Sequence, residues 1–376
     1  MGANKERLIS NYFELAGIDA ESFHEKEIGG VVVRKLNEYG LEVRTDTTDA
    51  VYLKDYPDSF SNIYGFLKGN AEGEPLLFTG HLDTVAPGNG KKLFITEDGR
   101  IQSKGNTVAG ADDIAGVASI LEALAVIKEK NLKHPDIEVL ITAAEEPFCE
   151  GSKYFHYDLI KARSGYTLDL TGKIGTAAIS APSIISFEID ITGKASHAGF
   201  APEEGINALN IAVNALKEFK TGHIDEETTL NFGTIEGGSG KNIVPEKIRI
   251  TGEIRSFSHE KARNISHKIR EVFNEKARKA GGMVRCQIEE HIRAYAVGEE
   301  DTVVQHFLEA TREEGLETRL IKTYGGSDAN RLNEEGIQTI VLSCAMERVH
   351  STEEYSDIEE LVRSANLVLR LMTSKL

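Results

Sequence analysis

The residues best suited to chemistry are histidines and carboxylates that lie next to apolar segments of the chain. His81 and Asp83 come directly after the apolar run 75–78. A neutral imidazole binds a metal ion through one ring nitrogen, and a carboxylate on the other nitrogen fixes its tautomer and orientation. Because a polar turn would give the same pattern, this pair predicts a metal site only together with further ligands.

Two pairs of adjacent carboxylates supply such ligands. Asp112 and Asp113 stand just before residues 114–130, whose apolar positions recur at helical spacing. At a helix N-terminus one carboxylate can cap the helix while the other faces a cation. Glu145 and Glu146 follow an apolar run that is typical of a strand buried on both faces. A carboxylate buried at the end of such a strand needs a partner, and a cation would supply it.

Asp169 and His350 complete the candidate set. Asp169 lies inside the apolar segment 166–170, where a carboxylate is costly unless it is paired or bound to metal. His350 follows the apolar run 340–344, although an ordinary loop histidine would look the same. Most of these two histidines and three carboxylates lie near the ends of strand-like runs, which is where open α/β sheets build their sites. Imidazole and carboxylate without thiolate favour Zn, Mn or Co in a hydrolytic two-metal centre.

The motifs around these residues resemble those of the M20 metallopeptidases, in particular the tripeptidases of the peptidase T type. The likeness covers almost the whole chain, and its motifs occur in the family's order. They are His81–Val85, Gly110–Asp113, Glu145–Glu146, Asp169, Ser196–Gly199, Pro202, Asn207–Ala208, Asn242–Pro245, Arg255 and Gly325–Asp328. The chain has Ile114 where many relatives carry Lys, and its residues 147–150 after the Glu pair differ from the sequence associated with the best-studied members.

The resemblance implies a dinuclear metal site and a role for each residue of the set. Two divalent ions per chain are expected, Zn or alternatively Co or Mn. By this likeness His81 and Asp169 hold one ion, Glu146 and His350 hold the other, Asp112 bridges them, Glu145 is the general base and Asp83 orients His81.

The resemblance also points to substrate-binding residues in the second half of the chain. His197 could donate a hydrogen bond to the oxyanion that forms as water attacks a carbonyl. Asn242 and Arg255 look like the family's substrate-binding pair, and Arg255 offers a bidentate partner for a carboxylate. Gly326 and Ser327 lie in a turn that could hold the substrate backbone. A surface histidine, a solvent-facing arginine and a plain loop are the alternative interpretations.

Length, charge and cysteine content favour a two-domain cytoplasmic enzyme. A chain of 376 residues exceeds a usual single domain. The formal net charge of −17 argues against nucleic acid, because phosphate binding needs clustered Lys and Arg. Three cysteines, Cys149, Cys286 and Cys344, give neither a disulfide framework nor a C-x-x-C metal site. We find no signal-peptide core and no apolar run near the roughly 18 residues of a membrane span, so we expect no membrane partner.

The pattern of elements predicts one domain inserted into another. Residues 1–177 and 292–376 alternate strand-like runs with helices, which predicts an α/β, doubly wound catalytic domain. Residues 178–291 read as strand, helix, strand, strand, helix, strand, the ferredoxin-like α+β arrangement. The resemblance implies that this inserted domain is a lid that also forms a homodimer contact.

We therefore expect hydrolysis of an amide bond in a short peptide, first as a tripeptide aminopeptidase. A metal-activated water would lose its proton to Glu145, which would pass it to the leaving amine. A carboxypeptidase or an N-acyl amino acid deacylase is the alternative, since the same centre can cleave any small amide. A catalytically silent binding protein of this fold is disfavoured by the intact Glu145 and ligand set.

Overall fold

The computed structural model describes residues 2–46, 54 and 56–374, and the chain folds into two compact units. The first unit comprises Met1–Ser180, Ala296–Thr323 and Ser327–Leu376. The second unit comprises Ala181–Tyr295 and Tyr324–Gly326.

The centre of the first unit is a block of four mutually parallel strands, β6, β3, β7 and β16, in that order. Every residue of β6 (Ile137–Thr142) and β3 (Leu76–His81) is buried, which explains their near-continuous apolar sequences. The remaining strands extend the sheet on both sides, with β2 antiparallel to β6. The other strands of this sheet are β1 (Glu42–Asp46), β2 (Asn62–Leu67), β4 (Leu93–Ile95), β5 (Arg100–Ser103), β7 (Ser164–Thr171), β8 (Thr176–Ala181), β14 (Tyr295–Ala296), β15 (Arg319–Lys322), β16 (Gln338–Glu347) and β17 (Tyr355–Asp357).

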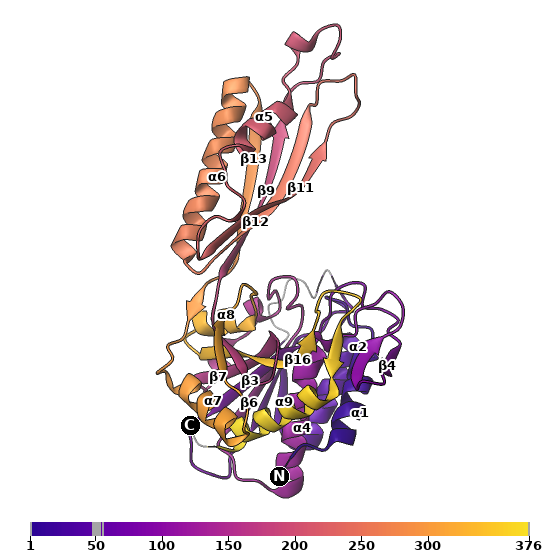
Figure 1. Cartoon of the computed structure of the whole chain (residues 1–376), viewed down its shortest axis with the longest axis vertical. Helices are drawn as coiled ribbons and strands as arrows, with labels where there is room; N and C mark the ends of the chain where they lie inside the picture. The colour runs from indigo at the N-terminus through magenta and orange to yellow at the C-terminus, as the bar shows by residue number, and fades with distance from the viewer. Residues whose placement is uncertain (1, 47–53, 55, 375–376) are drawn as a thin grey trace. The chain divides into compact units, whose positions relative to one another are not determined.

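Helices cover this sheet, and α4 (Ala111–Lys130) is the most deeply buried of them (Figure 1). All of its residues from Ala111 to Ile127 are buried, because it packs against α1, α9, β3 and β16. A helix surrounded in this way needs apolar residues on every side. The other helices of the unit are α1 (Lys5–Ala16), α2 (Lys26–Tyr39), α7 (Thr302–Glu313), α8 (Asp328–Glu334), α9 (Ile358–Thr373) and the 3-10 turns Ser152–Tyr154 and Tyr157–Leu159.

The second unit is an antiparallel sheet in the order β10-β11-β12-β9-β13, which confirms the ferredoxin-like arrangement. Its helices pack on the sheet over a core that includes Ile189, Ile250 and Phe273 (Figure 1). Alternate residues of β9 are buried, as expected of a strand with one covered face. The elements are β9 (Ser183–Thr192), a 3-10 turn (Pro202–Glu204), α5 (Ala208–Leu216), β10 (Gly222–His223), β11 (Thr228–Gly237), β12 (Lys247–Ser256), α6 (His259–Ala280) and β13 (Met283–Ile292).

Two further findings concern the whole described chain. Cys149, Cys286 and Cys344 form no disulfide. Within residues 2–46, 54 and 56–374, none of the helices combines the length and the apolar character that a membrane span requires.

Candidate active site

The first unit brings the five proposed metal ligands together. His81 is the last residue of β3, and Asp169 lies near the end of the parallel neighbour β7. Glu146 follows β6, Asp112 lies at the start of α4, and His350 comes from the loop between β16 and β17. Carboxyl ends of parallel strands share one edge of a sheet, so residues far apart in sequence converge there.

The five side chains form two groups that share Asp112. Ligand atoms of His81, Asp112 and Asp169 lie within 4.8 Å of one another, and so do those of Asp112, Glu146 and His350. Oδ1 of Asp112 lies 3.1 Å from Nε2 of His81, and its Oδ2 lies 3.3 Å from Nε2 of His350. Nε2 of His350 is also 3.0 Å from Oε2 of Glu146. Asp112 thus turns one carboxylate oxygen toward each group.

The chemistry of these groups fits divalent cations. Burial and the charges of Asp112 and Glu145 raise the pKa of Asp169 well above its usual value. Hydrogen bonds to Asp112 and Glu146 raise the pKa of His350 to about 10, so the groups favour positive charge. Oε1 of Glu146 is buried and accepts no hydrogen bond from any residue that the structure describes. Nitrogen and carboxylate donors at this spacing suit Zn, Co or Mn.

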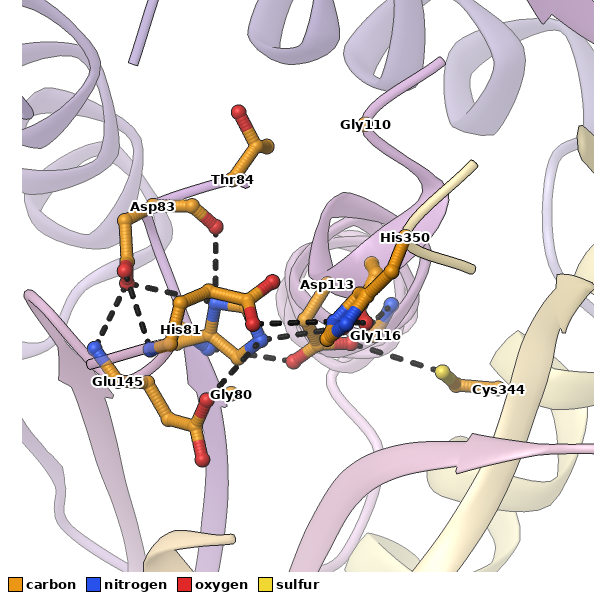
Figure 2. A network of polar contacts seen from close by, with 12 residues as sticks. Gly80, His81, Asp83, Thr84, Gly110, Asp113, Gly116, Glu145, Cys344 and His350 are labelled. Atoms are coloured by element: carbon orange, nitrogen blue, oxygen red, sulfur yellow. Dashed lines mark hydrogen bonds and ion pairs between the residues drawn. The ribbon is translucent and has the colours of Figure 1, made fainter. Parts of the chain in front are cut away.

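The partner of His81 differs in detail from the expected one. Nδ1 of His81 lies 2.9 Å from the main-chain oxygen of Asp83, whereas Oδ1 of Asp83 is 3.5 Å away. The Asp83 carboxylate instead accepts the main-chain N–H groups of Glu145 at 2.9 Å and Glu146 at 3.2 Å. A fully buried carboxylate needs such donors, and the turn after β6 supplies them (Figure 2). Asp83 therefore links the His81 ring to the backbone of the Glu pair.

Glu145 lies beside the ligand groups without joining them. Its Oε2 is 4.0 Å from Nε2 of His81. Burial raises the pKa of Glu145 well above 4.5. A carboxylate held at this distance, with a raised affinity for a proton, can act as a base toward a water bound between the groups.

Three further buried carboxylates fix the backbone around the site. The sequence pointed to Asp113 but not to Glu354 or Glu25. Glu354 accepts the N–H groups of Gly110 at 2.7 Å and Asp112 at 3.1 Å. Asp113 accepts the N–H of His81 and also caps the start of α4, as one of the two Asp residues was expected to do. Glu25 accepts the N–H of Ala144. Glu354 and Glu25 stand among other charged residues, and no sequence pattern distinguishes them from surface charge.

The second unit contains most of the proposed substrate-binding residues. His197 and Asn242 are exposed neighbours, since the N–H of Ala198 donates to the main-chain oxygen of Asn242. Nδ1 of His197 accepts the N–H groups of Gly199 and Phe200, both at 3.1 Å, so the ring proton lies on Nε2.

Arg255 and the turn at Gly326 and Ser327 already have protein partners. Nε and Nη2 of Arg255 contact the two carboxylate oxygens of Glu253 at 2.8 and 3.2 Å, and Nη1 donates to the main-chain oxygen of Tyr324. The Ser327 hydroxyl caps α8 by accepting the N–H of Ala329. A Cβ on Gly326 would lie 2.1 Å from Cδ1 of Ile292, so a larger residue there would have to displace the end of that side chain.

Comparison with known proteins identifies the family. A family model of the M20 type, described as a peptidase dimerisation domain, matches residues 179–281, and one described as peptidase family M28 matches residues 62–215. The uncharacterized protein YqjE of Bacillus subtilis is 38% identical over 98% of each chain.

Two solved structures are similar over the whole chain. The aminopeptidase PepT from Bacillus cereus has 37% identity and a TM-score of 0.90 over 99% of this chain and 98% of its own. A tripeptidase from Staphylococcus aureus has 33% identity and a TM-score of 0.94 over 99% of each chain. The family resemblance seen in the motifs is confirmed, and the chain belongs to the M20 family of metallopeptidases.

Proposed function

We propose that the chain is a tripeptide aminopeptidase that uses two divalent metal ions. The observation that carries the proposal is the pair of ligand groups that share Asp112, with the Glu145 carboxylate beside them. The choice of substrate is supported by the similarity to an aminopeptidase and a tripeptidase over 99% of this chain.

In this proposal each ligand group holds one ion. His81 and Asp169 would bind one ion, and Glu146 and His350 would bind the other. Asp112 would offer one carboxylate oxygen to each ion. When bound, the ions supply Lewis-acid polarisation of the substrate carbonyl and lower the pKa of the attacking water. The two oxygens of Asp112 contact different histidines, Oδ1 at 3.1 Å from Nε2 of His81 and Oδ2 at 3.3 Å from Nε2 of His350, which supports the bridging role.

Proton transfer falls to Glu145. Its carboxylate accepts the proton of the attacking water and then donates it to the amine of the departing residue, so that one group serves as base and then as acid. Asp83 supports this step, because its carboxylate fixes the main-chain N–H groups of Glu145 and Glu146.

The proposed substrate contacts come from the second unit. The Nε2–H of His197 donates to the oxygen of the attacked carbonyl, where negative charge develops. Arg255 binds the peptide's C-terminal carboxylate and thereby sets the peptide length. The three hydrogen bonds of its guanidinium leave at most two of five N–H hydrogens for that carboxylate, so the substrate shares Arg255 with Glu253.

A panel of matched peptides tests the substrate assignment. The zinc-loaded enzyme is offered a dipeptide, a tripeptide, a tetrapeptide and the N-acetylated tripeptide, and the products are read by mass. The proposal predicts loss of the N-terminal residue from the free tripeptide and little turnover of the acetylated form. Preferred cleavage of the N-acyl compound would make the enzyme a deacylase, and release of the C-terminal residue would make it a carboxypeptidase.

We further propose that the enzyme is a cytoplasmic homodimer that associates through the second unit. The peptidase dimerisation domain match covers residues 179–281 of that unit. Phe200, Ile235 and Met283 are large apolar side chains exposed there. Light scattering should give twice the chain mass, and Met283→Glu should reduce it if this surface is buried between subunits.

A further inference from the structure

The turn that follows the Glu pair has an unusual backbone. Phe148 and Cys149 have φ angles of 65° and 58°, a left-handed conformation that surrounding contacts must hold. The N–H of Cys149 donates to the main-chain oxygen of Glu145 at 2.6 Å, and the Cys149 carbonyl accepts the N–H of Lys153. The Cys149 side chain is therefore fixed next to that of Glu145.

The thiol of Cys149 contacts the Glu145 carboxylate directly. Its Sγ lies 3.3 Å from Oε1 of Glu145, and Cys149 is only 1% exposed. Because a carboxylate only accepts hydrogen bonds, the S–H group is the donor. Burial, together with the charges of Glu145 and Asp328, raises the pKa of the thiol well above 9, so the proton stays on the sulfur.

The two oxygens of Glu145 thus have different surroundings. Oε1 accepts the Cys149 thiol. Oε2 lies 4.0 Å from Nε2 of His81, and Figure 2 shows the Glu145 side chain directed toward the His81 ring. Without the thiol, the carboxylate could rotate about its last side-chain bond, whose torsion has a broad energy minimum. Proton transfer to a carboxylate slows when the accepting oxygen leaves the productive position.

We infer that Cys149 is a positioning residue that holds Oε1 of Glu145 and so keeps Oε2 directed at the attacking water. This inference rests on the proposed role of Glu145 as general base. It assigns a purpose to the Cys149 thiol in the turn that follows the Glu pair.

Steady-state kinetics of the metal-loaded, full-length enzyme on a tripeptide tests this role. Cys149→Ala should lower kcat by about 10- to 100-fold, the scale expected when a catalytic group is misplaced by about 1 Å. KM and bound metal should stay near the wild-type values, because no proposed ligand changes. Cys149→Ser keeps a hydroxyl donor and should recover most of the lost kcat. Cys286→Ala, which removes a thiol from the second unit, is the matched control and should behave as wild type.

Two additional variants separate positioning from folding and from the proposed function. Cys149→Gly removes the thiol but suits the left-handed backbone, so it should fold and show the same loss of kcat as the Ala variant. In a Glu145→Gln background, Cys149→Ala should cause no further loss. Wild-type kcat in the Ala and Gly variants, equal losses in Ala and Ser, or an additive loss in the double variant would each overturn the inference. Full turnover by Glu145→Gln alone would instead refute the proposed function.

Discussion

The two units hold their candidate functional residues in contrasting ways. In the first unit His81, Asp83 and Asp112 are 1%, 0% and 6% exposed, and His350 is the one exposed residue among the five proposed ligands. The main-chain oxygen of Asp83 holds the His81 ring, and the N–H of Glu145 holds the Asp83 carboxylate. The Glu354 carboxylate accepts the main-chain N–H of Asp112. In the second unit His197 is exposed, and its ring accepts the N–H groups of Gly199 and Phe200 from the turn that follows it.

This difference matches a division between chemistry and substrate recognition. Groups that bind ions or move protons work best when they are fixed before the substrate arrives, which requires burial and many hydrogen bonds. Groups that contact a peptide must stay accessible to it. We therefore expect changes in the first unit to alter metal content or kcat, and changes in the second to act through the bound substrate.

The largest effect is expected within the Glu pair. Glu145→Gln keeps the shape of the side chain but cannot accept the proton, so turnover should fall by roughly 10²- to 10⁴-fold while bound metal stays near wild type. Glu146→Gln replaces a charged ligand by a neutral one, so metal should bind more weakly and added metal should restore part of the rate. Metal analysis and kinetics on both variants check this prediction. The reverse pattern would mean that the two roles are exchanged.

His197 should give the next largest effect. His197→Ala removes the proposed donor to the oxyanion and should lower kcat by about 10²- to 10³-fold, with metal content unchanged. His197→Gln retains an N–H donor and should lose less. Stopped assays at saturating tripeptide measure both variants, and equal rates in His197→Ala and wild type would place this histidine outside the reaction.

The next prediction concerns whether Arg255 of the second unit binds the C-terminal carboxylate of the peptide. Amidating the tripeptide's C-terminus should cost about 1.5 to 3 kcal/mol in kcat/KM, the worth of a hydrogen bond to a charged group. Glu253→Gln weakens the competing carboxylate and should lower KM for the free acid without affecting the amide. If amidation has no effect in either background, Arg255 does not bind the substrate carboxylate.

Substitution of Glu354 should have the smallest effect, and this effect should appear in the affinity for metal. Glu354 does not touch the proposed ions, but its carboxylate positions Asp112 through the main-chain N–H groups of Gly110 and Asp112. Loss of such a supporting contact typically weakens metal binding by about 10- to 100-fold. Competition with a chelator should show this weakening in Glu354→Gln, and unchanged affinity would show that the backbone alone fixes Asp112.

Sequence reasoning predicted the parts of this molecule that follow from periodicity and residue type. Near-continuous apolar runs predicted β3 and β6, and the strand and helix order predicted the arrangement of the second unit. The convergence of His81 and Asp169 followed from their place near the carboxyl ends of parallel strands, here β3 and β7.

The details that sequence reasoning missed depend on backbone conformation. The Asp83 carboxylate binds the turn at Glu145 and Glu146 rather than the imidazole alone, because that turn directs its N–H groups inward. Cys149 contacts Glu145 from a position where its own backbone is left-handed. No sequence pattern marks either of these backbone conformations, because the same residue types also occur in ordinary backbone conformations.

Two ions that share Asp112 both depend on its carboxylate, so the metal content per chain is the decisive measurement. The chelator-treated enzyme is reloaded with zinc, dialysed and analysed for metal and protein together with Asp112→Ala and His81→Ala. We expect about two ions in the wild type, about one in His81→Ala and well under one in Asp112→Ala, with activity following the metal. A fully active enzyme that holds no metal, or an Asp112→Ala variant that still binds two ions, would contradict it.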